Sequence, residues 1–173
     1  MKVKHNAEII VGDYEFAESL NKEVLHQLKY ATDHGHTNVK GSMHTGWDWL
    51  PDNQKFKNFK SLIECEIQKK CVRPLFGCEK RSGSLKNFWG NVYKKGDYAQ
   101  YHDHLYYDFS FAYFVKAKWY DSPLVFTDSG KKIRPKEGRY VIFPACLKHH
   151  VPKHRYNHDR ITLSGNYRLN KWE

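Results

Sequence analysis

The sequence predicts a mainly β protein, a β-barrel or jelly roll with helices packed outside it. Eight short β-rich runs separated by turn residues fill the chain after residue 83, and both helical patterns precede them. Helices followed by a block of strands indicate an antiparallel barrel rather than alternating βαβ units. Aromatic residues make up 16% of the chain, which favours strands over a helical bundle.

The length of 173 residues is that of one domain with a full core. No repeat, linker or low-complexity segment divides the chain. We therefore expect a single domain over 1–173, with a helical portion at 1–83 and a β-barrel core at 84–168.

The first element is an amphipathic helix expected over residues 13–31. Its apolar stripe recurs at four-residue steps and consists of Phe16, Leu20, Val24 and Leu28. Gly12-Asp13 offers an N-terminal cap. A second helix, from Asp52 to Cys71, carries the stripe Phe56, Phe59, Ile63 and Ile67.

The stretch between these helices is predicted to be irregular. It contains three histidines, whose spacing matches no ligand motif and which we expect on the surface: His34, His36 and His44. Trp47 and Trp49 allow two interpretations. They either cover the mouth of a pocket or belong to the core.

The β-rich part begins at Ser84 and is punctuated by glycine and proline. The expected strands are Leu85–Tyr93, Ala99–His104, Phe109–Ala117, Leu124–Thr127, Lys131–Arg134, Arg139–Phe143, Leu147–Val151 and Arg160–Arg168.

Composition constrains partners and location only loosely. The formal net charge is +10, but the basic residues are scattered, so a nucleic-acid partner is a minor alternative. The 4 cysteines form no CxxC pair, which favours reduced thiols. The sequence shows neither a signal peptide nor a membrane span, and we expect a cytoplasmic protein.

Histidines on two predicted strands suggest a metal site. His102 and His104 are two residues apart, so they share one face of a regular strand. A third imidazole from a later strand would complete the site, since neutral imidazole suits iron, zinc, copper and nickel. Alternation allows only one of His149 and His150 to face inward, and the pattern alone does not select between them.

A second pair lies on the last predicted strand. A buried arginine at position 160, followed two residues later by the Thr162 hydroxyl, would clamp a carboxylate. Taken alone, Arg160 is better interpreted as a surface residue of a strand.

An ordered set of motifs over residues 84–168 resembles the 2-oxoglutarate- and iron(II)-dependent oxygenases. The set comprises Trp89–Tyr98, His102-Asp103-His104, Phe109–Tyr113, Pro123–Phe126, Phe143-Pro144, Leu147–Val151 and Arg160–Asn166. The resemblance is to the small, prolyl-hydroxylase-like branch found in phage and marine bacteria.

The resemblance implies a double-stranded β-helix of the cupin-like jelly-roll type, binding iron(II) and 2-oxoglutarate and reacting with molecular oxygen. It assigns His102 and His149 to the metal, and Arg160 with Thr162 to the far carboxylate of 2-oxoglutarate. Tyr93 matches a tyrosine that helps hold that carboxylate. Asn91, on the same strand face, is a weaker candidate for the same pocket. The implied reaction hydroxylates an unactivated C–H bond and decarboxylates 2-oxoglutarate to succinate.

The chain departs from the family pattern at the second metal ligand. The family places Asp or Glu two residues after the first histidine, where this chain has His104. Either three histidines hold the metal, as the small branch suggests, or a bulge turns Asp103 inward. We favour His104. Without the carboxylate the metal unit is more positive by one charge, and the native metal is less determined.

Two rival functions use the same residues differently. A cupin-like three-histidine enzyme that does not use 2-oxoglutarate, such as a thiol dioxygenase, would leave Arg160 and Thr162 without a joint role. A non-enzymatic barrel that binds nucleic acid would use the basic and aromatic residues. The sequence leaves the substrate open among a prolyl residue of a peptide, a nucleobase and a small metabolite, with slight weight on an anionic one.

Overall fold

Two antiparallel sheets form the framework of the computed structural model, which describes residues 7–35, 38–70 and 82–170. The larger sheet consists, in spatial order, of β1 (Ile10–Asp13), β9 (Arg139–Pro144), β6 (Phe109–Lys116), β11 (Arg160–Leu169), β4 (Gly83–Tyr93) and β3 (Met43–His44). The smaller sheet consists of β2 (Val39–Lys40), β5 (Tyr98–His102), β10 (His149–Val151), β7 (Leu124–Phe126) and β8 (Lys132–Ile133). This order, with strands paired across long connections, is that of a jelly roll.

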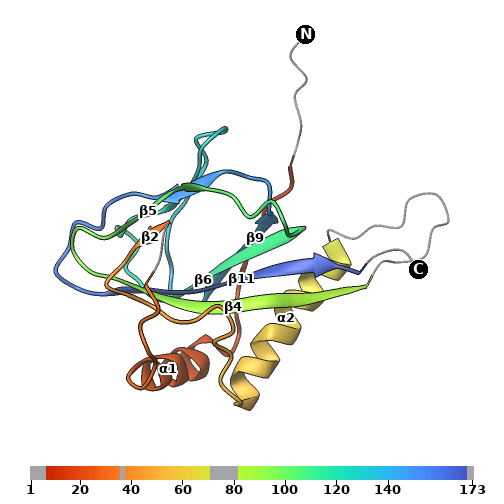
Figure 1. Cartoon of the computed structure of the whole chain (residues 1–173), viewed down its shortest axis with the longest axis horizontal. Helices are drawn as coiled ribbons and strands as arrows, with labels where there is room; N and C mark the ends of the chain where they lie inside the picture. The colour runs from red at the N-terminus through yellow and green to blue at the C-terminus, as the bar shows by residue number, and fades with distance from the viewer. Residues whose placement is uncertain (1–6, 36–37, 71–81, 171–173) are drawn as a thin grey trace, which may run out of the picture.

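Both helices cover one face of the larger sheet (Figure 1), and the smaller sheet covers the other. Helix α1 spans Ala17–Leu28 and α2 spans Gln54–Lys70. Their buried apolar side chains are those of the two predicted stripes, apart from Phe16: Leu20, Val24, Leu28, Phe56, Phe59, Ile63 and Ile67. The predicted jelly roll with helices outside it is confirmed.

Alternation along the strands of the larger sheet separates two cores. On β6, Phe111 and Tyr113 pack toward the helices, whereas Phe114 packs between the sheets. On β11, Ile161 and Leu163 belong to the helix-side core. Their neighbours at even positions, Arg160 and Thr162, therefore point between the sheets. The fold thus places polar side chains of β11 in the interior.

The start of the first helix was wrongly predicted. Gly12 and Asp13 do not cap α1; they end β1, where they pair with Tyr140 and Arg139 of β9. The Asp13 carboxylate accepts from Lys136 at 2.6 Å, an ion pair that the cap prediction did not foresee. Phe16 lies before the helix and is 61% exposed.

The eight predicted strands are all present, with ends within two residues of the expected bounds. The short strands β1, β2 and β3 were not predicted. His44 was wrongly placed on the surface: it lies at the end of β3 and is buried, whereas His34 is exposed as expected. His36 falls outside the described residues.

The two tryptophans of the loop have different surroundings. Trp49 packs against Phe56 of α2 with ring centroids 5.6 Å apart and belongs to the helix-side core. Trp47 is 45% exposed and contacts Trp89, with ring centroids 4.6 Å apart. Each of the two sequence interpretations thus holds for one residue.

Cys65 and Cys146 are exposed free thiols; Cys71 and Cys78 fall outside the described residues. Neither α1 nor the described part of α2 is long and apolar enough to cross a membrane.

Candidate functional site

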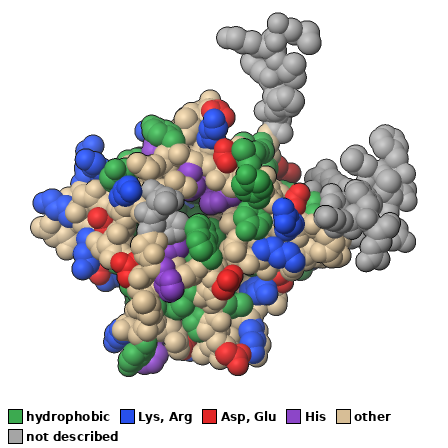
Figure 2. All heavy atoms as spheres, in the orientation of Figure 1, with side chains coloured by type: hydrophobic (Ala, Val, Ile, Leu, Met, Phe, Trp, Pro, Cys, Tyr) green, Lys and Arg blue, Asp and Glu red, His purple; other side chains and the backbone are tan. Residues whose placement is uncertain are grey.

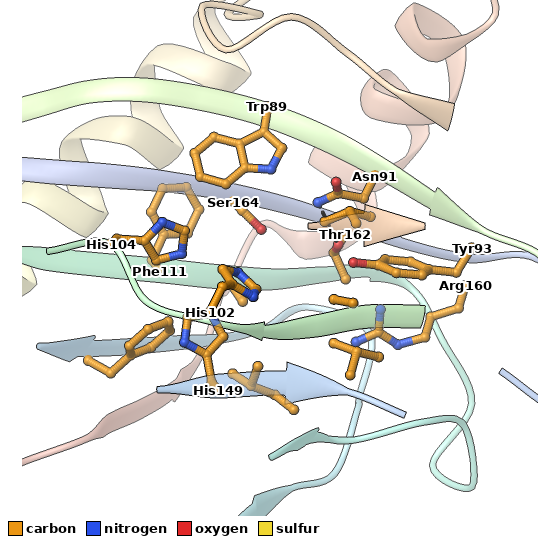
Figure 3. A pocket seen from close by; sticks show the side chains of 16 residues that line it. Trp89, Asn91, Tyr93, His102, His104, Phe111, His149, Arg160, Thr162 and Ser164 are labelled. Atoms are coloured by element: carbon orange, nitrogen blue, oxygen red, sulfur yellow. Dashed lines mark hydrogen bonds between the residues drawn. The ribbon is translucent and has the colours of Figure 1, made fainter. Parts of the chain in front are cut away.

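A small cavity lies between the two sheets, with three histidines at one end and an arginine at the other (Figure 3). Its volume is about 50 Å³. The described residues that line it include no Asp or Glu. The polar and aromatic lining side chains are Trp89, Asn91, Tyr93, His102, His104, Phe111, Phe143, His149, Arg160, Thr162 and Ser164.

The imidazoles of His102, His104 and His149 converge. One ring nitrogen from each lies within 4.8 Å of the others. His102 ends β5 and pairs directly with His149 of β10, so the antiparallel register brings these two rings to 4.3 Å between centroids. The predicted set of three is therefore together in space, and its spacing suits a metal ion.

Backbone carbonyls orient two of these rings. His102 Nδ1 donates to the Gln100 carbonyl at 2.7 Å, and His149 Nδ1 donates to the Leu147 carbonyl at 2.8 Å. A carbonyl only accepts, so each Nδ1 carries the proton and each Nε2 keeps a free lone pair. Metal-ligating histidines are commonly held in this way.

Burial keeps the three imidazoles neutral. Desolvation, together with the smaller effect of the neighbouring histidines, lowers the pKa of His104 to about 3 and that of His149 to about 4. Desolvation also lowers the pKa of His102, against the raising effect of its hydrogen bond to Gln100. Neutral imidazoles are the form that binds a metal.

His104 reaches the site from beyond the end of β5, not from the strand as the alternation argument assumed. Its backbone N–H donates to the Ala145 carbonyl at 2.8 Å, which pins the loop after β5 to the turn after β9. Asp103 does not join the cluster but lines a neighbouring groove. His150, on the opposite side of β10, stacks on Tyr101 with centroids 4.2 Å apart.

Arg160 occupies the other end of the cavity and is 2% exposed. Its Nε donates to the Ser122 carbonyl at 3.1 Å, and its guanidinium lies over the rings of Tyr93 and Phe114, 4.9 and 5.3 Å from the centroids. Its Nη1 is buried without a hydrogen-bond partner. A buried cation with an unmet donor is costly, so the cavity favours an anion at this point.

Three polar side chains lie between the arginine and the histidines. Thr162 and Asn91 are direct cross-strand partners, and Asn91 Nδ2 donates to Thr162 Oγ1 at 3.4 Å (Figure 3). Asn91 Oδ1 is buried without a partner. Ser164, the next inward residue of β11, lines the same wall. Sequence reasoning did not name Ser164, although the alternation that placed Arg160 and Thr162 inward extends to it.

A wider groove of about 480 Å³ adjoins His104. Its aromatic lining comes from Trp47, Tyr106 and Tyr107, and Asp103 is its acidic residue. Amides line it as well, from Asn38, Asn87 and Asn166. No Lys or Arg stands among the described lining residues. In Figure 2, histidine and hydrophobic side chains gather near the middle of the visible face, with basic side chains spread around them.

Comparisons with known proteins find relatives by structure alone. No protein-family model matches the sequence, and no curated protein matches it. A collagen prolyl hydroxylase of Paramecium bursaria chlorella virus 1, solved with 2-oxoglutarate, superposes with a TM-score of 0.69 at 13% identity, covering 92% of this chain and 94% of that one. The chain has the jelly-roll fold of the 2-oxoglutarate- and iron(II)-dependent oxygenases.

Two further neighbours carry other ligands. HygX of Streptomyces hygroscopicus, solved with nickel and 2-oxoglutarate, has a TM-score of 0.67 at 12% identity and covers 93% of this chain and 82% of that one. A prolyl hydroxylase of Trichoplax adhaerens, in complex with a peptide fragment of hypoxia inducible factor, has a TM-score of 0.65 at 14% identity, with coverage of 92% and 82%. The TM-scores and coverage show a shared fold.

Proposed function

We propose that the chain is a 2-oxoglutarate- and iron(II)-dependent dioxygenase that hydroxylates an unactivated C–H bond. In this proposal His102, His104 and His149 hold the metal. Arg160 and Thr162 bind the far carboxylate of 2-oxoglutarate, supported by Tyr93 and Asn91. When bound, iron(II) and 2-oxoglutarate supply the oxidising chemistry, with decarboxylation of the 2-oxo acid to succinate.

One observation carries the proposal: the buried Arg160, with an unpartnered Nη1, shares an acid-free cavity with three neutral histidines. A dianion with one carboxylate at each end would satisfy the arginine and reach the metal. Three imidazole nitrogens leave coordination positions open, and imidazole suits iron(II). The residues present therefore fit both groups.

The cavity walls have three roles in this scheme. Arg160 fixes one end of the co-substrate by charge-assisted hydrogen bonds, which are the stronger kind. Thr162 lines the same cavity, and the Tyr93 ring lies against the cation. Aromatic side chains close the space around the histidines and exclude water.

A cupin-like enzyme that does not use 2-oxoglutarate explains the histidines but gives Arg160 no ligand. A nucleic-acid-binding barrel explains neither feature. The combination of a metal-type cluster and an unsatisfied buried cation in one cavity therefore favours the 2-oxoglutarate-dependent reaction.

For the substrate, we propose that it binds in the groove beside His104 and that it is neutral or cationic rather than anionic. The described lining residues offer aromatic faces, amides and the Asp103 carboxylate, with no basic side chain. Peptides suit such a surface, because amides pair with the backbone and aromatic rings pack on side chains. A prolyl residue remains the first choice, and the peptide complex of the Trichoplax neighbour supports it.

The proposal is tested by loading metal-free protein with iron(II) and measuring succinate formed from 2-oxoglutarate in air, with a panel of proline-containing peptides. We expect succinate from the wild type and a loss of at least 100-fold in His149→Ala. His150→Ala is the matched control, because His150 faces the other side of β10 and should retain activity. Failure of the wild type to bind 2-oxoglutarate in the presence of metal would refute the proposal.

A further inference from the structure

A second cluster of potential metal ligands lies outside the cavity. The loop before β7 contributes Asp121, and the loop between β10 and β11 contributes His154 and His158. One ligand atom from each lies within 4.8 Å of the others. Asp121 and His154 are 2% and 1% exposed, so this is a buried group rather than a chance gathering of surface charges.

The hydrogen bonds of His154 leave one ring nitrogen available. Nε2 lies 2.7 Å from the His158 carbonyl. Because a carbonyl only accepts, the proton is on Nε2 and Nδ1 carries a bare lone pair. That Nδ1 is buried and has no hydrogen-bond partner. A histidine held by one nitrogen on a backbone carbonyl, with the other left open, has the arrangement of a metal ligand.

The other two side chains are held in place as well. Asp121 Oδ2 accepts from the Lys118 backbone N–H at 2.8 Å, which leaves Oδ1 facing His158 Nε2, also at 2.8 Å. The His158 side chain is 24% exposed and its ring stacks on Tyr156. Solvent can therefore reach the cluster from the side of His158.

The backbone of His154 is fixed independently of its side chain. Its N–H donates to the Asp97 carbonyl at 2.7 Å, and its carbonyl accepts from the Gly96 N–H at 2.7 Å. The ring is therefore presented from a rigid position between the turn after β4 and the strand β11. A preformed ligand lowers the ordering cost of binding an ion.

We propose that Asp121, His154 and His158 form a second metal site, which takes a divalent cation of the zinc type. Two imidazoles and one carboxylate make a mixed N/O donor set, which suits Zn²⁺ rather than Ca²⁺ or Mg²⁺. Tetrahedral bonds of about 2.0–2.1 Å separate ligand atoms by roughly 3.3 Å, so the widest pair must close by at most ~1.5 Å. Water from the exposed side completes the coordination.

The site would tie two loops together next to Arg160. Asp121 directly precedes Ser122, whose carbonyl accepts from Arg160 Nε at 3.1 Å. His158 stands two residues before Arg160 in the chain. An ion bound here would restrict the motion of both loops and so hold the Arg160 side chain in place. This consequence, unlike the site itself, rests on the proposed role of Arg160 in binding 2-oxoglutarate.

The test counts zinc in an untagged chain whose cavity cluster is removed by His102→Ala and His149→Ala. After chelation and equilibrium dialysis against micromolar Zn²⁺, we expect about one zinc per chain by elemental analysis. Adding His154→Gln or Asp121→Asn should bring the count close to zero, whereas adding His150→Gln should leave it unchanged. Cobalt(II) should give the visible absorption of a tetrahedral N/O site in the same protein.

The proposal is overturned if the cavity double variant itself binds almost no zinc. It is also overturned if His154→Gln and Asp121→Asn both leave the zinc count of that variant unchanged. Circular dichroism confirms that each variant is folded. If the cavity double variant unfolds, the wild type replaces it, and His158→Asn should lower its zinc count by one per chain. The count is independent of 2-oxoglutarate, so failure of the proposed dioxygenase activity would leave it unaffected.

Discussion

Replacing Arg160 by methionine should separate ligand binding from stability. The side chain is 2% exposed, donates to the Ser122 carbonyl and hydrogen-bonds to the Tyr93 side chain, while Nη1 has no partner. Methionine keeps most of the length and apolar contact of the arginine stem but removes the charge. The ligand-free protein then loses an unsatisfied cation, and the complex loses its carboxylate anchor.

The effect of Arg160→Met on 2-oxoglutarate binding should differ in sign or in size from its effect on the stability of the ligand-free protein. Removing one partner of a buried charged pair costs about 2–5 kcal/mol of binding free energy, which weakens 2-oxoglutarate binding by roughly 30-fold to several thousand-fold. Replacing a buried ion by an apolar residue of similar volume is often neutral or stabilising, and a lost hydrogen bond from a charged donor is worth about 1.5–3 kcal/mol. We expect the free energy of unfolding without ligand to fall by less than about 3 kcal/mol or to rise.

Calorimetry with zinc-loaded protein, which does not turn over, measures the affinity for 2-oxoglutarate, and urea unfolding of the metal-free protein measures stability. Arg168→Met is the matched control, since Arg168 lies on the same strand but is exposed. Unchanged affinity in Arg160→Met, together with a loss of more than about 3 kcal/mol of stability, would show that Arg160 is structural. That result would refute the reasoning.

Three further predictions concern the ligand set and the scaffold. His104→Ala should weaken zinc binding in the cavity at least 100-fold, and Asp103→Ala less than threefold, as measured by equilibrium dialysis. A larger loss of zinc affinity in Asp103→Ala than in His104→Ala would show that the Asp103 carboxylate is the ligand. The pKa values of His104 and His149 are lowered from 6.5 to about 3 and 4 in the folded metal-free chain. Below pH 6.5 these two imidazoles are therefore protonated in the unfolded chain but not in the folded one. Stability should therefore fall as the pH drops from 6.5 to 4, by up to about 1.4 kcal/mol per pH unit for each imidazole; urea unfolding that is flat over this window would contradict the assignment. A Cβ on Gly165 would lie 2.5 Å from the Asn87 carbonyl oxygen and from Phe111. Gly165→Ala should therefore lower the free energy of unfolding by about 1–3 kcal/mol. An unchanged midpoint of urea unfolding would show that the sheet accommodates the methyl group without cost.

The strands β4, β6 and β11 were predictable because each is long enough to show its pattern. The short strands β7, β8 and β10 were marked instead by the glycines and prolines around them. In β11, apolar Ile161 and Leu163 alternate with polar Arg160 and Thr162, and the two faces meet different cores. The missed strands β1, β2 and β3 have four, two and two residues. Such short elements are determined by their pairing partners, which a local pattern does not contain.

The errors at the N-terminal portion have the same origin. Gly12-Asp13 looked like a helix cap because glycine and aspartate favour that position. The pairing of β1 with β9 and the Asp13 ion pairs with Lys136 and Arg139 use these residues instead. His44 was predicted on the surface because the spacing of the three loop histidines matches no ligand motif, yet its register with Asn91 on β4 buries it. Tertiary pairing, not propensity, decides both.

The histidine cluster shows how a correct grouping can rest on an incorrect local geometry. Strand alternation placed His102 and His104 on one face, but β5 ends at His102. His104 arrives through a loop whose position is set by its hydrogen bond to the Ala145 carbonyl, more than forty residues later. The same loop directs Asp103 into the groove. Whether an imidazole or a carboxylate lies beside His102 and His149 is thus decided by a contact that no local pattern records.

Charge is separated inside this molecule in a way that the net value of +10 conceals. Among the described lining residues, the cavity has Arg160 and no acid, whereas the adjoining groove has Asp103 and no base. A dianionic co-substrate and a cationic substrate would therefore each meet the opposite charge, and each would be disfavoured in the other's place. Like charges brought together across an interface oppose wrong partners as effectively as attraction favours right ones. No lysine stands among the described lining residues of the cavity or the groove. The net charge of the whole chain is therefore no argument for an anionic substrate in the groove.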